Sequence, residues 1–598
     1  PDEPAGSADI EDSETDKAVD DIAAKESDMV LAVEDARNSK KGKPSKGGGP
    51  GWKAKLKDLF KNKWTWVGIA VLLLVVFALP LTRYKILGLL VKEPVTVTVL
   101  DSKTGTPVSS AQVTLAGDTV KTDGEGQAHL KAGLGRRTLT VSKQYYTDLS
   151  TSYFVGFKKP SQPTQLRIVA TGRLVPVTVL NSITGKPLGG VDVDVKNTSA
   201  KTNSKGVATI ALPTTAATYS AKLSSNGYNP ATVTVQVTDQ TVKANSFNLT
   251  PSGQIYFLSN ASGTIDVVKS NLDGTGRKTI LAGTGHEDPN STSLLASRDW
   301  QFLVLDSKRD GTHETLTLID TSDDKTVSFD NTTSDFQLIG WSNHYFMYDL
   351  VKSNQQVWQP GNEVIKSYDA DNQQLNQLDQ SQAQGDPSTA YYFQRFSNFY
   401  IVSGSLVYLT QWDTGNSISP DYTGKSNTIR AVQPNGQNKK DYLSLSPSAS
   451  TFGEVALYSP QAVYFSAFDT SSNPTYYDFE DLAAKPVKLD NSIFSQTYPT
   501  WLQSPSGNQT FWTELRDGKN TLFTGNSSAG NKKQIATNSD FTPYGWFSDN
   551  YLLVSKNSSE LYVIPAGGLS SGQQPLKISN YYKPARTFNG YGGGYGGQ

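Results

Sequence analysis

The chain has 598 residues, a formal net charge of −1 and no cysteine. Its length predicts several domains, and the absence of cysteine excludes disulfides, thiolate metal sites and a cysteine nucleophile. The near-zero net charge conceals an acidic stretch over residues 1–35 and a basic stretch over 37–63, both poor in large apolar side chains. We therefore expect residues 1–63 to be a disordered tail. Its basic part could lie on anionic lipid headgroups, and its acidic part could dock on a basic partner.

Residues 64–82 form the longest apolar run, WTWVGIAVLLLVVFALPLT. About 19 residues at 1.5 Å each span about 28 Å, close to the hydrocarbon core of a bilayer. Because the preceding flank carries more lysines than the following one, the positive-inside rule predicts a cytoplasmic tail and an extracytoplasmic remainder. A buried core helix and a cleaved signal peptide are the alternatives, and the length and position of the run disfavour both. The residues expected to flank the lipid bilayer are Lys61, Lys63, Trp64, Trp66, Arg83, Tyr84 and Lys85.

Beyond a linker over 83–93, the chain repeats itself. The segment Val97–Val108 matches Val177–Leu188, and Lys121–Gly126 matches Lys201–Gly206. Short stretches in both copies alternate apolar and polar residues, as half-buried strands do. The sequence therefore predicts two Greek-key β-sandwiches, at 94–171 and 172–250.

The repeated pattern is D/N-x-x-T-G-x-P followed by K-T-D/N-x-x-G. It resembles the carboxypeptidase regulatory-like, or transthyretin-like, domain, and residues 95–250 carry it twice. The resemblance implies modules that act as spacers or packing partners without chemistry of their own. Asp101 and Asp123 could be calcium ligands, but their counterparts are Asn181 and Asn203. We therefore expect all four side chains to cap turns.

Residues 252–581 are richer in aromatics, and a serine, a polar turn and an aromatic strand recur along them. This recurring pattern predicts a β-propeller of about seven blades. Six or eight blades also fit the pattern, and one large sandwich is the alternative fold. The pattern resembles TolB-like and dipeptidyl-peptidase-like propellers, whose blades carry S-P-D-G. The best matches are Leu502–Trp512 and Ser270–Gly276, and they imply an architecture more than a function. Residues 582–598 are a Gly/Tyr-rich tail that we expect to be flexible.

Catalytic motifs are missing from the sequence. The histidines His129, His286, His313 and His344 have no metal-binding spacing, and the cluster at 286–288 is only a weak candidate for metal contact. There is no G-x-S-x-G elbow and no phosphate loop. We therefore predict no enzyme, no cofactor and no metal. We also predict no nucleic-acid partner, because the extracytoplasmic part is not basic.

Recognition remains as the expected function, since propellers present variable loops on a broad face. The candidate ligand-binding residues are Trp341, Trp412, Tyr422 and Trp546, with packing inside a blade as the alternative role for the tryptophans. The insertion Gln411–Asn438 is the expected projecting loop.

The sequence thus predicts a mostly β, single-pass protein of a bacterial cell envelope with its N-terminus in the cytoplasm. Two sandwiches form a stalk, and the propeller is a docking head for an envelope protein or a cell-wall glycan. Two alternatives are kept. One is a transmembrane sensor that couples a propeller ligand to the tail. The other is a propeller hydrolase with acids clustered on the loop face. The oligomeric state is left open.

Overall fold

The computed structural model describes residues 67, 70, 71, 88 and 91–583, except for gaps at 158–161, 239–244, 418, 449, 460–461, 481–486, 490–501, 517–518 and 537–539. The chain divides into two units, Pro1–Val91 and Lys92–Gln598. Within the described part, no helix has both the length and the apolar character needed to cross a membrane. Most of the predicted span 64–82, all seven predicted flanking residues and the tail after 583 lie outside the described residues.

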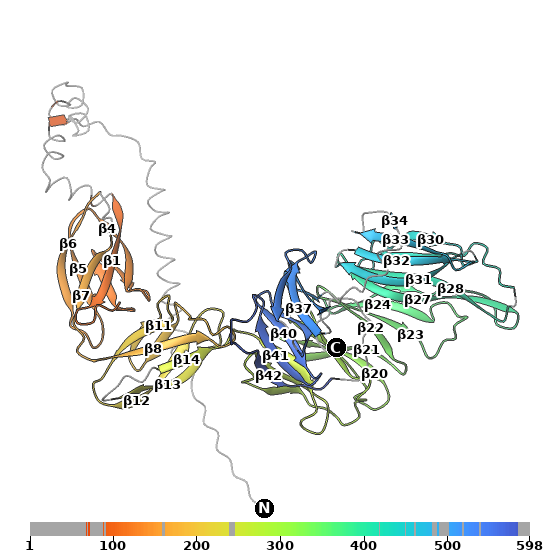
Figure 1. Ribbon diagram of the computed structural model, residues 1–598, viewed down its shortest axis with the longest axis horizontal. Coiled ribbons are helices and arrows are strands. Elements are labelled where there is room, and N and C mark those ends of the chain that lie inside the picture. Colours follow the sequence, from red (N-terminus) through yellow and green to blue (C-terminus); the bar gives the residue numbers. More distant parts are fainter. Residues whose placement is uncertain are drawn as a thin grey trace, which may run out of the picture. The chain divides into compact units, whose positions relative to one another are not determined.

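The described part of the second unit is built almost entirely of strands, as the sequence predicts (Figure 1). Its first seven strands form two sheets, in the orders β4-β1-β7 and β3-β2-β5-β6. Strands β1 and β7 run parallel, and the other pairs are antiparallel. The strands are β1 (Lys92–Asp101), β2 (Gln112–Leu115), β3 (Asp118–Lys121), β4 (Gln127–Gly133), β5 (Gly135–Ser142), β6 (Leu149–Val155) and β7 (Thr164–Ile168).

The next seven strands repeat this topology, in the orders β11-β8-β14 and β10-β9-β12-β13. One core cluster draws residues from both sheets, so the two sheets pack face to face. We call the two copies sandwich 1 and sandwich 2. The strands of sandwich 2 are β8 (Arg173–Asn181), β9 (Asp192–Val195), β10 (Thr198–Lys201), β11 (Val207–Leu212), β12 (Ala217–Ser224), β13 (Ala231–Val237) and β14 (Asn245–Leu249).

The repeated motif caps the turn after the first strand in each sandwich. Asp101 Oδ1 accepts the backbone N–H groups of Lys103 and Thr104, and Asn181 Oδ1 accepts those at 183 and 184. Gly105 and Gly185 follow at φ of 68° and 65°, in the left-handed region that glycine adopts without strain. The expectation of turn capping is confirmed at both positions.

The second copy differs from the first where it meets the following strands. Ile183, which replaces Lys103, is 2% exposed and belongs to the hydrophobic cluster of the C-terminal sheets. Asn181 Nδ2 donates to the hydroxyls of Tyr228 and Tyr551, both at 3.0 Å. Sandwich 2 is therefore joined to these sheets through the loop that sandwich 1 leaves exposed.

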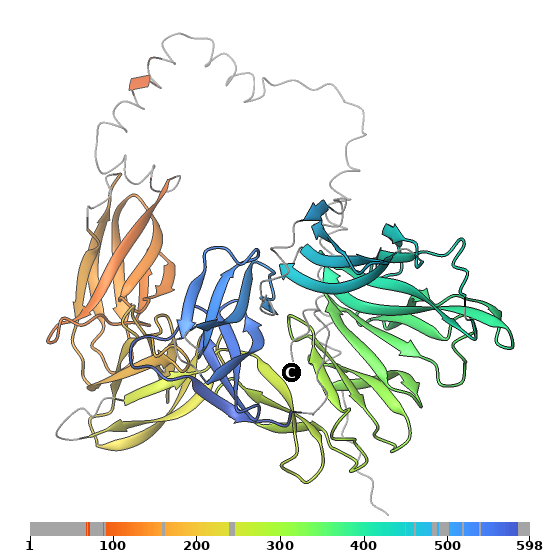
Figure 2. The ribbon, with the colours of Figure 1, turned by 45° about the vertical axis from the view of Figure 1, so that its right-hand side comes forward.

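Between Gln254 and Asn580 the described residues form seven further sheets of consecutive antiparallel strands (Figure 2). The sequence predicts about seven blades. The first sheet has three strands, the fourth has five and the others have four.

We refer to these sheets as blades 1 to 7. Blade 1 contains β15 (Gln254–Ser259), β16 (Asp266–Asn271) and β17 (Lys278–Leu281). Blade 2 contains β18 (Ser293–Ala296), β19 (Phe302–Ser307), β20 (Glu314–Asp320) and β21 (Lys325–Thr332). Blade 3 contains β22 (Phe336–Ser342), β23 (Tyr345–Val351), β24 (Glu363–Asp369) and β25 (Gln374–Gln380).

Blades 4 and 5 contain β26 (Ala383–Asp386), β27 (Ala390–Val402), β28 (Ser405–Gly415), β29 (Asn427–Val432) and β30 (Lys440–Leu445); and β31 (Ser450–Ser459), β32 (Ala462–Asp469), β33 (Pro474–Glu480) and β34 (Val487–Leu489). Blades 6 and 7 contain β35 (Leu502–Gln503), β36 (Gln509–Arg516), β37 (Lys519–Asn526) and β38 (Lys533–Ala536); and β39 (Phe541–Ser548), β40 (Tyr551–Lys556), β41 (Glu560–Pro565) and β42 (Leu576–Asn580).

The last blade packs on the first without sharing a strand with it. One cluster contains buried residues of blades 6, 7, 1 and 2, and others join blades 2 and 3, 3 and 4, and 4 and 5. Each described blade is made of strands consecutive in sequence, so the last blade is held on the first by apolar side chains and by hydrogen bonds such as that from the Tyr582 backbone N–H to the Leu258 oxygen at 2.8 Å.

Trp300 bridges blades 2 and 7 across the three-stranded blade 1. Its indole Nε1 donates to the backbone oxygen of Trp546 at 2.8 Å, and the side chain is 5% exposed. Trp300 has a φ of 62°, where a bulky residue is strained. In blade 6 the matching turn position is held by Gly507 at a φ of 73°. The Trp300 side chain therefore offsets a backbone cost that glycine avoids.

Asp330 and Asp379 connect neighbouring blades at their outer strands. Each follows a β-bulge, and each accepts a tyrosine hydroxyl and a cation from the next blade. Asp330 Oδ2 receives Tyr348 at 2.5 Å and Lys366 at 2.7 Å. Asp379 Oδ2 accepts the Tyr408 hydroxyl at 2.6 Å and the guanidinium of Arg430, on the next strand, at 2.7 Å.

The Trp300 contact can be tested with Trp300→Phe, which keeps an aromatic ring but removes the N–H donor. The buried oxygen of Trp546 then loses its partner, which costs about 1–3 kcal/mol. We expect urea unfolding of the full chain to show the propeller transition destabilised by that amount. Trp358→Phe, at a half-buried position, is the control and should change stability by less than about 0.5 kcal/mol. Equal effects of the two variants would contradict a bridging role.

The junction can be tested by exchanging the residues that differ between the copies. Ile183→Lys places an ammonium in an apolar cluster, and we expect the junction to open and the chain to be cleaved near residues 250–254 at least tenfold faster by a dilute protease. The reverse exchange, Lys103→Ile, lies on an exposed turn and should leave the cleavage rate unchanged. Protection that persists in the Ile183→Lys variant would show that the junction does not depend on this side chain.

Candidate binding surface on the fourth blade

The structure places two of the predicted ligand-binding tryptophans inside the propeller. Trp341 and Trp546 are 1% and 0% exposed. Their indole nitrogens donate to the backbone oxygens of Leu295 and Leu502, on the first strand of the preceding blade, at 3.1 and 2.9 Å. The expectation that these side chains are exposed is wrong, because each lies on the first strand of its blade with its ring packed between two blades. The alternative role in packing describes them correctly.

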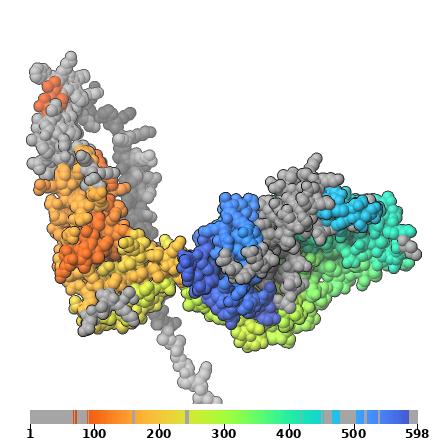
Figure 3. Space-filling model, in the orientation of Figure 1, coloured from red at the N-terminus to blue at the C-terminus, as the bar shows by residue number. Residues whose placement is uncertain are grey.

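Trp412 and Tyr422 come together on an extension of blade 4. Strands β27 and β28 form the longest hairpin of the propeller, and the loop 416–426 follows β28. Figure 1 shows β28 at the outer end of the propeller, and Figure 3 shows this part of the chain in teal on the visible surface. The projecting part lies within the predicted insertion Gln411–Asn438, although that range also contains strand β29.

One face of the extension carries an aromatic group around a lysine. Lys425 Nζ lies 4.2 Å from the ring centroid of Tyr392 and 5.7 Å from that of Trp412. The rings of Tyr392 and Tyr422 meet edge to face at 5.8 Å, and the Tyr392 hydroxyl accepts the backbone N–H of Asp421 at 2.8 Å. Trp412 is 7% exposed, whereas the two tyrosines are half-buried. Trp412 is therefore the buried base of this group, and Tyr392, Tyr422 and Lys425 are its solvent-accessible members.

The other face of the hairpin carries a second aromatic group. Tyr391 meets Trp358 edge to face at 5.3 Å and stacks on Phe393 at 5.8 Å. Arg395 lies 5.0 Å from the Phe393 ring and forms an ion pair with Asp413 at 2.9 Å. We call the two groups together the blade-4 surface, defined by Trp358, Tyr391, Tyr392, Phe393, Trp412, Tyr422 and Lys425.

Sequence reasoning missed Trp358 and the run Tyr391–Phe393. The signal was three consecutive aromatics before Arg395, since alternation along a strand sends neighbouring rings to opposite faces. Burial, and secondarily Asp413, raise the pKa of Tyr422, so this hydroxyl stays protonated at neutral pH and can donate to a ligand.

The carboxyl groups with the clearest pKa shifts in blade 3 are interior. Asp349 and Glu363 are 2% and 7% exposed on neighbouring strands, and Glu363 accepts the backbone N–H of Phe396 in blade 4 at 3.1 Å. Burial raises the pKa of Glu363 to about 7, and burial together with Glu363 raises that of Asp349 well above its usual value. Paired acids can act in catalysis, but these two are shielded from solvent between blades.

Three histidines are engaged in local contacts. His344 Nε2 bonds Asp299 at 2.9 Å and its Nδ1 bonds Asp371 at 2.9 Å, which joins turns of blades 2 and 3. His313 bonds Asp310, and His129 bonds Thr96. No group of three or more His, Cys, Asp or Glu residues suited to a metal ion occurs in the described residues.

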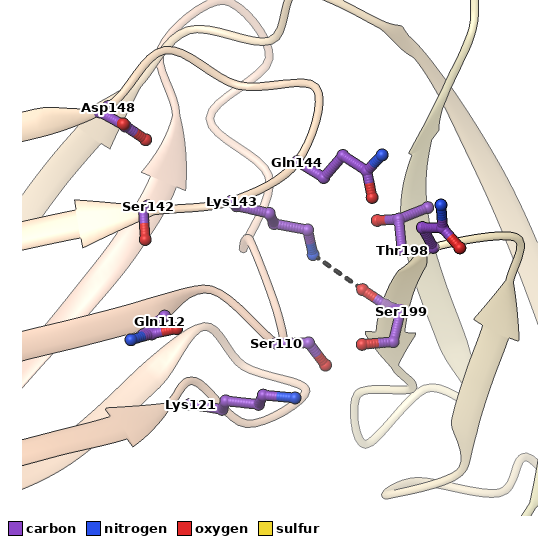
Figure 4. Close-up of a pocket in the computed structure, with 10 residues that line it drawn as sticks. Ser110, Gln112, Lys121, Ser142, Lys143, Gln144, Asp148, Thr198 and Ser199 are labelled. Atoms are coloured by element: carbon purple, nitrogen blue, oxygen red, sulfur yellow. Dashed lines mark hydrogen bonds between the residues drawn. The ribbon is translucent and has the colours of Figure 1, made fainter.

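A polar cavity of about 400 Å³ lies between the two sandwiches, lined by Lys121, Lys143 and residues of both modules (Figure 4). Lys143 Nζ donates to the backbone oxygens of Ser109 in sandwich 1 and Ser199 in sandwich 2, the latter at 3.0 Å. Burial, with a smaller contribution from Lys121, lowers the pKa of Lys143 to about 8. Because the Lys143 ammonium donates to a carbonyl of each sandwich, it links sandwich 1 to sandwich 2.

Comparisons with known proteins give no family. No family model matches the chain, and no curated protein matches it. Among solved structures, the propeller domain of the Trilobed protease from Pyrococcus furiosus is 10% identical, with 56% of this chain and 94% of that chain covered at a TM-score of 0.32. Oligogalacturonate lyase from Vibrio parahaemolyticus is 8% identical, with 51% and 83% covered at 0.28.

TolB from Acinetobacter baumannii is 12% identical, with 56% of this chain and 77% of that chain covered at a TM-score of 0.24. The assignment of a propeller here therefore rests on the seven consecutive sheets and their packing.

The buried acid pair predicts a pH dependence of stability. The pKa of Glu363 is about 7 in the fold and about 4.5 in an unfolded chain, so the unfolded state loses its proton first as pH rises. The contribution of Glu363 to stability should fall between pH 4.5 and 7, by at most about 3 kcal/mol, and change no further above that range.

Glu363→Gln keeps an oxygen for Phe396 N–H and should make the loss of stability between pH 5 and pH 8, measured by urea unfolding, smaller than in the unaltered chain, where burial also raises the pKa of Asp349 and of Glu314. Glu560→Gln is the matched control, because Lys577 holds the pKa of Glu560 below its usual value and outside this window. An equal reduction of the fall in the control variant would contradict the assignment to Glu363.

Proposed function

We propose that this protein is a membrane-anchored binding protein of the cell envelope that acts outside the cytoplasm. Its propeller is the docking head, and the two sandwiches are the stalk. The observation that carries the proposal is the blade-4 surface, where aromatic rings and cations cover both faces of one projecting hairpin. The apolar run 64–82 and its basic flank support the membrane anchor.

The chemistry of the blade-4 surface suits recognition. Tyrosine and tryptophan offer large rigid faces with a polar tip, so they stack on sugar rings or pack into a protein interface at low entropic cost. Lys425 and Arg395 hold positive charge beside these rings, which favours partners that carry carboxylates or phosphates. The proposed partners are accordingly an envelope protein or an acidic cell-wall glycan.

The hairpin geometry separates recognition from folding. Tyr391 and Tyr392 belong to the part of β27 that pairs with the end of β28, beyond the rows that pack against neighbouring blades. Changes in this extension therefore leave the blade core in place. A loop carried on a rigid scaffold in this way is where binding residues usually occur.

The test uses the double variant Tyr392→Ala/Tyr422→Ala in the full chain. We expect its dissociation constant for purified cell-wall polysaccharide, or its yield of envelope-protein crosslinks in intact cells, to worsen at least tenfold. The matched control is Val327→Ala/Leu375→Ala, which removes exposed apolar side chains from blades 2 and 3. An equal loss in the control, or no loss in the tyrosine variant, would reject the blade-4 surface as the docking site.

A further inference from the structure

Phe154 and Phe157 are the most exposed large apolar side chains of the described part of residues 92–583, at 52% and 53%. Phe154 is near the end of β6, the outer strand of its sheet, and Phe157 follows two residues after that strand. Two exposed phenylalanines so close together mark an interaction surface, since single exposed apolar residues are common but neighbouring aromatics are not.

Strand pairing places this pair at the end of sandwich 1 where the chain enters. Lys92, the first residue of β1, pairs with Gly133, and Gly135 begins β5 opposite Val155. Arg136 is the cross-strand partner of Phe154. The opposite end of β1 leads into the turn that contains Lys103, so the phenylalanines and Lys103 mark the two ends of the module.

The charges around the phenylalanines are mainly positive. Lys92, Lys131 and Arg136 are exposed, while the acids nearby are the half-buried Glu93 and Asp118, which accepts the backbone N–H of Lys131. Aromatic rings among lysine and arginine side chains suit the headgroup region of an anionic bilayer, where the rings enter the interface and the cations meet lipid phosphates.

The connection to the proposed membrane anchor is short. Residues 83–91 separate the apolar run from β1, and nine residues reach at most about 30 Å even when fully extended. The end of sandwich 1 that carries Phe154 and Phe157 therefore stays within reach of the bilayer whenever residues 64–82 span it.

We infer that this end of sandwich 1 rests on the surface of an anionic bilayer, with Phe154 and Phe157 in the headgroup region and Lys92 and Arg136 against lipid phosphates. The inference rests on the proposed membrane anchor. It gives sandwich 1 a second attachment besides the anchor, so the stalk leaves the membrane in a preferred direction rather than swinging freely.

The absence of cysteine makes a direct test possible, because a single introduced cysteine is the only thiol. Gly156→Cys keeps both phenylalanines and takes a fluorophore beside them. The full chain is reconstituted in vesicles of phosphatidylcholine and phosphatidylglycerol, three to one, with and without a lipid that carries a quencher at headgroup depth. We expect at least twofold more quenching at position 156 than in the control Lys103→Cys, labelled at the other end of the module.

Adding Phe154→Ser and Phe157→Ser to the labelled Gly156→Cys chain should lower its quenching to the control value. Vesicles of phosphatidylcholine alone should also lower it, because the cations then lose their anionic partners. Equal quenching at 156 and 103 would overturn the inference, and undiminished quenching in neutral vesicles would overturn its electrostatic part. Flotation separates the two proposals: a chain that does not float with vesicles refutes the anchor, whereas one that floats but is unquenched at 156 refutes only the bilayer contact.

Discussion

The contact between the last blade and the first is the constraint on which the rest of the propeller depends. Many ring-shaped folds fasten their ends by pairing a strand from one end of the chain with one from the other. Here every described blade is made of consecutive strands, so the ends are held together by the apolar cluster of blades 6, 7, 1 and 2 and by hydrogen bonds such as that from Tyr582 N–H to the Leu258 oxygen. The strained backbone at Trp300 is explained by this requirement. A glycine would relax the turn but could not reach the backbone of blade 7.

The same constraint accounts for the junction with sandwich 2. Ile183 enters the cluster that closes the ring, and the neighbouring Asn181 reaches Tyr551 on blade 7. Sandwich 2 is thus attached at the place where the last blade packs on the first, and the attachment adds apolar contacts there. The two sandwiches share a topology, yet only the copy next to the propeller carries an apolar residue on this turn. One position of a repeated motif has changed from a solvent-exposed lysine to a packing isoleucine.

The sequence was informative where a local rule decides the structure. The alternation of valines indicated the strands of both sandwiches, and the D/N-x-x-T-G pattern indicated the capped turns, because both signals depend on neighbouring residues alone. It could not indicate which tryptophans are buried. Trp341 and Trp546 lie on strands close to polar turns, and their rings become internal only because the preceding blade offers a backbone oxygen at the right distance. The bulged aspartates between blades depend in the same way on a partner strand far along the chain.

The structure places aromatic residues in two different settings, and the proposed binding surface belongs to the second. Between blades, a ring is fixed by burial and by a hydrogen bond to a neighbouring strand, so changing it disturbs the ring of blades. On the hairpin of β27 and β28 the rings contact one another and nearby cations, and the strands continue past the rows that support the core. Tyr392 and Tyr422 can therefore rearrange around a partner at a small cost to the fold. The chain thus separates aromatic residues that pack between blades from aromatic residues on a hairpin that extends beyond the blade core.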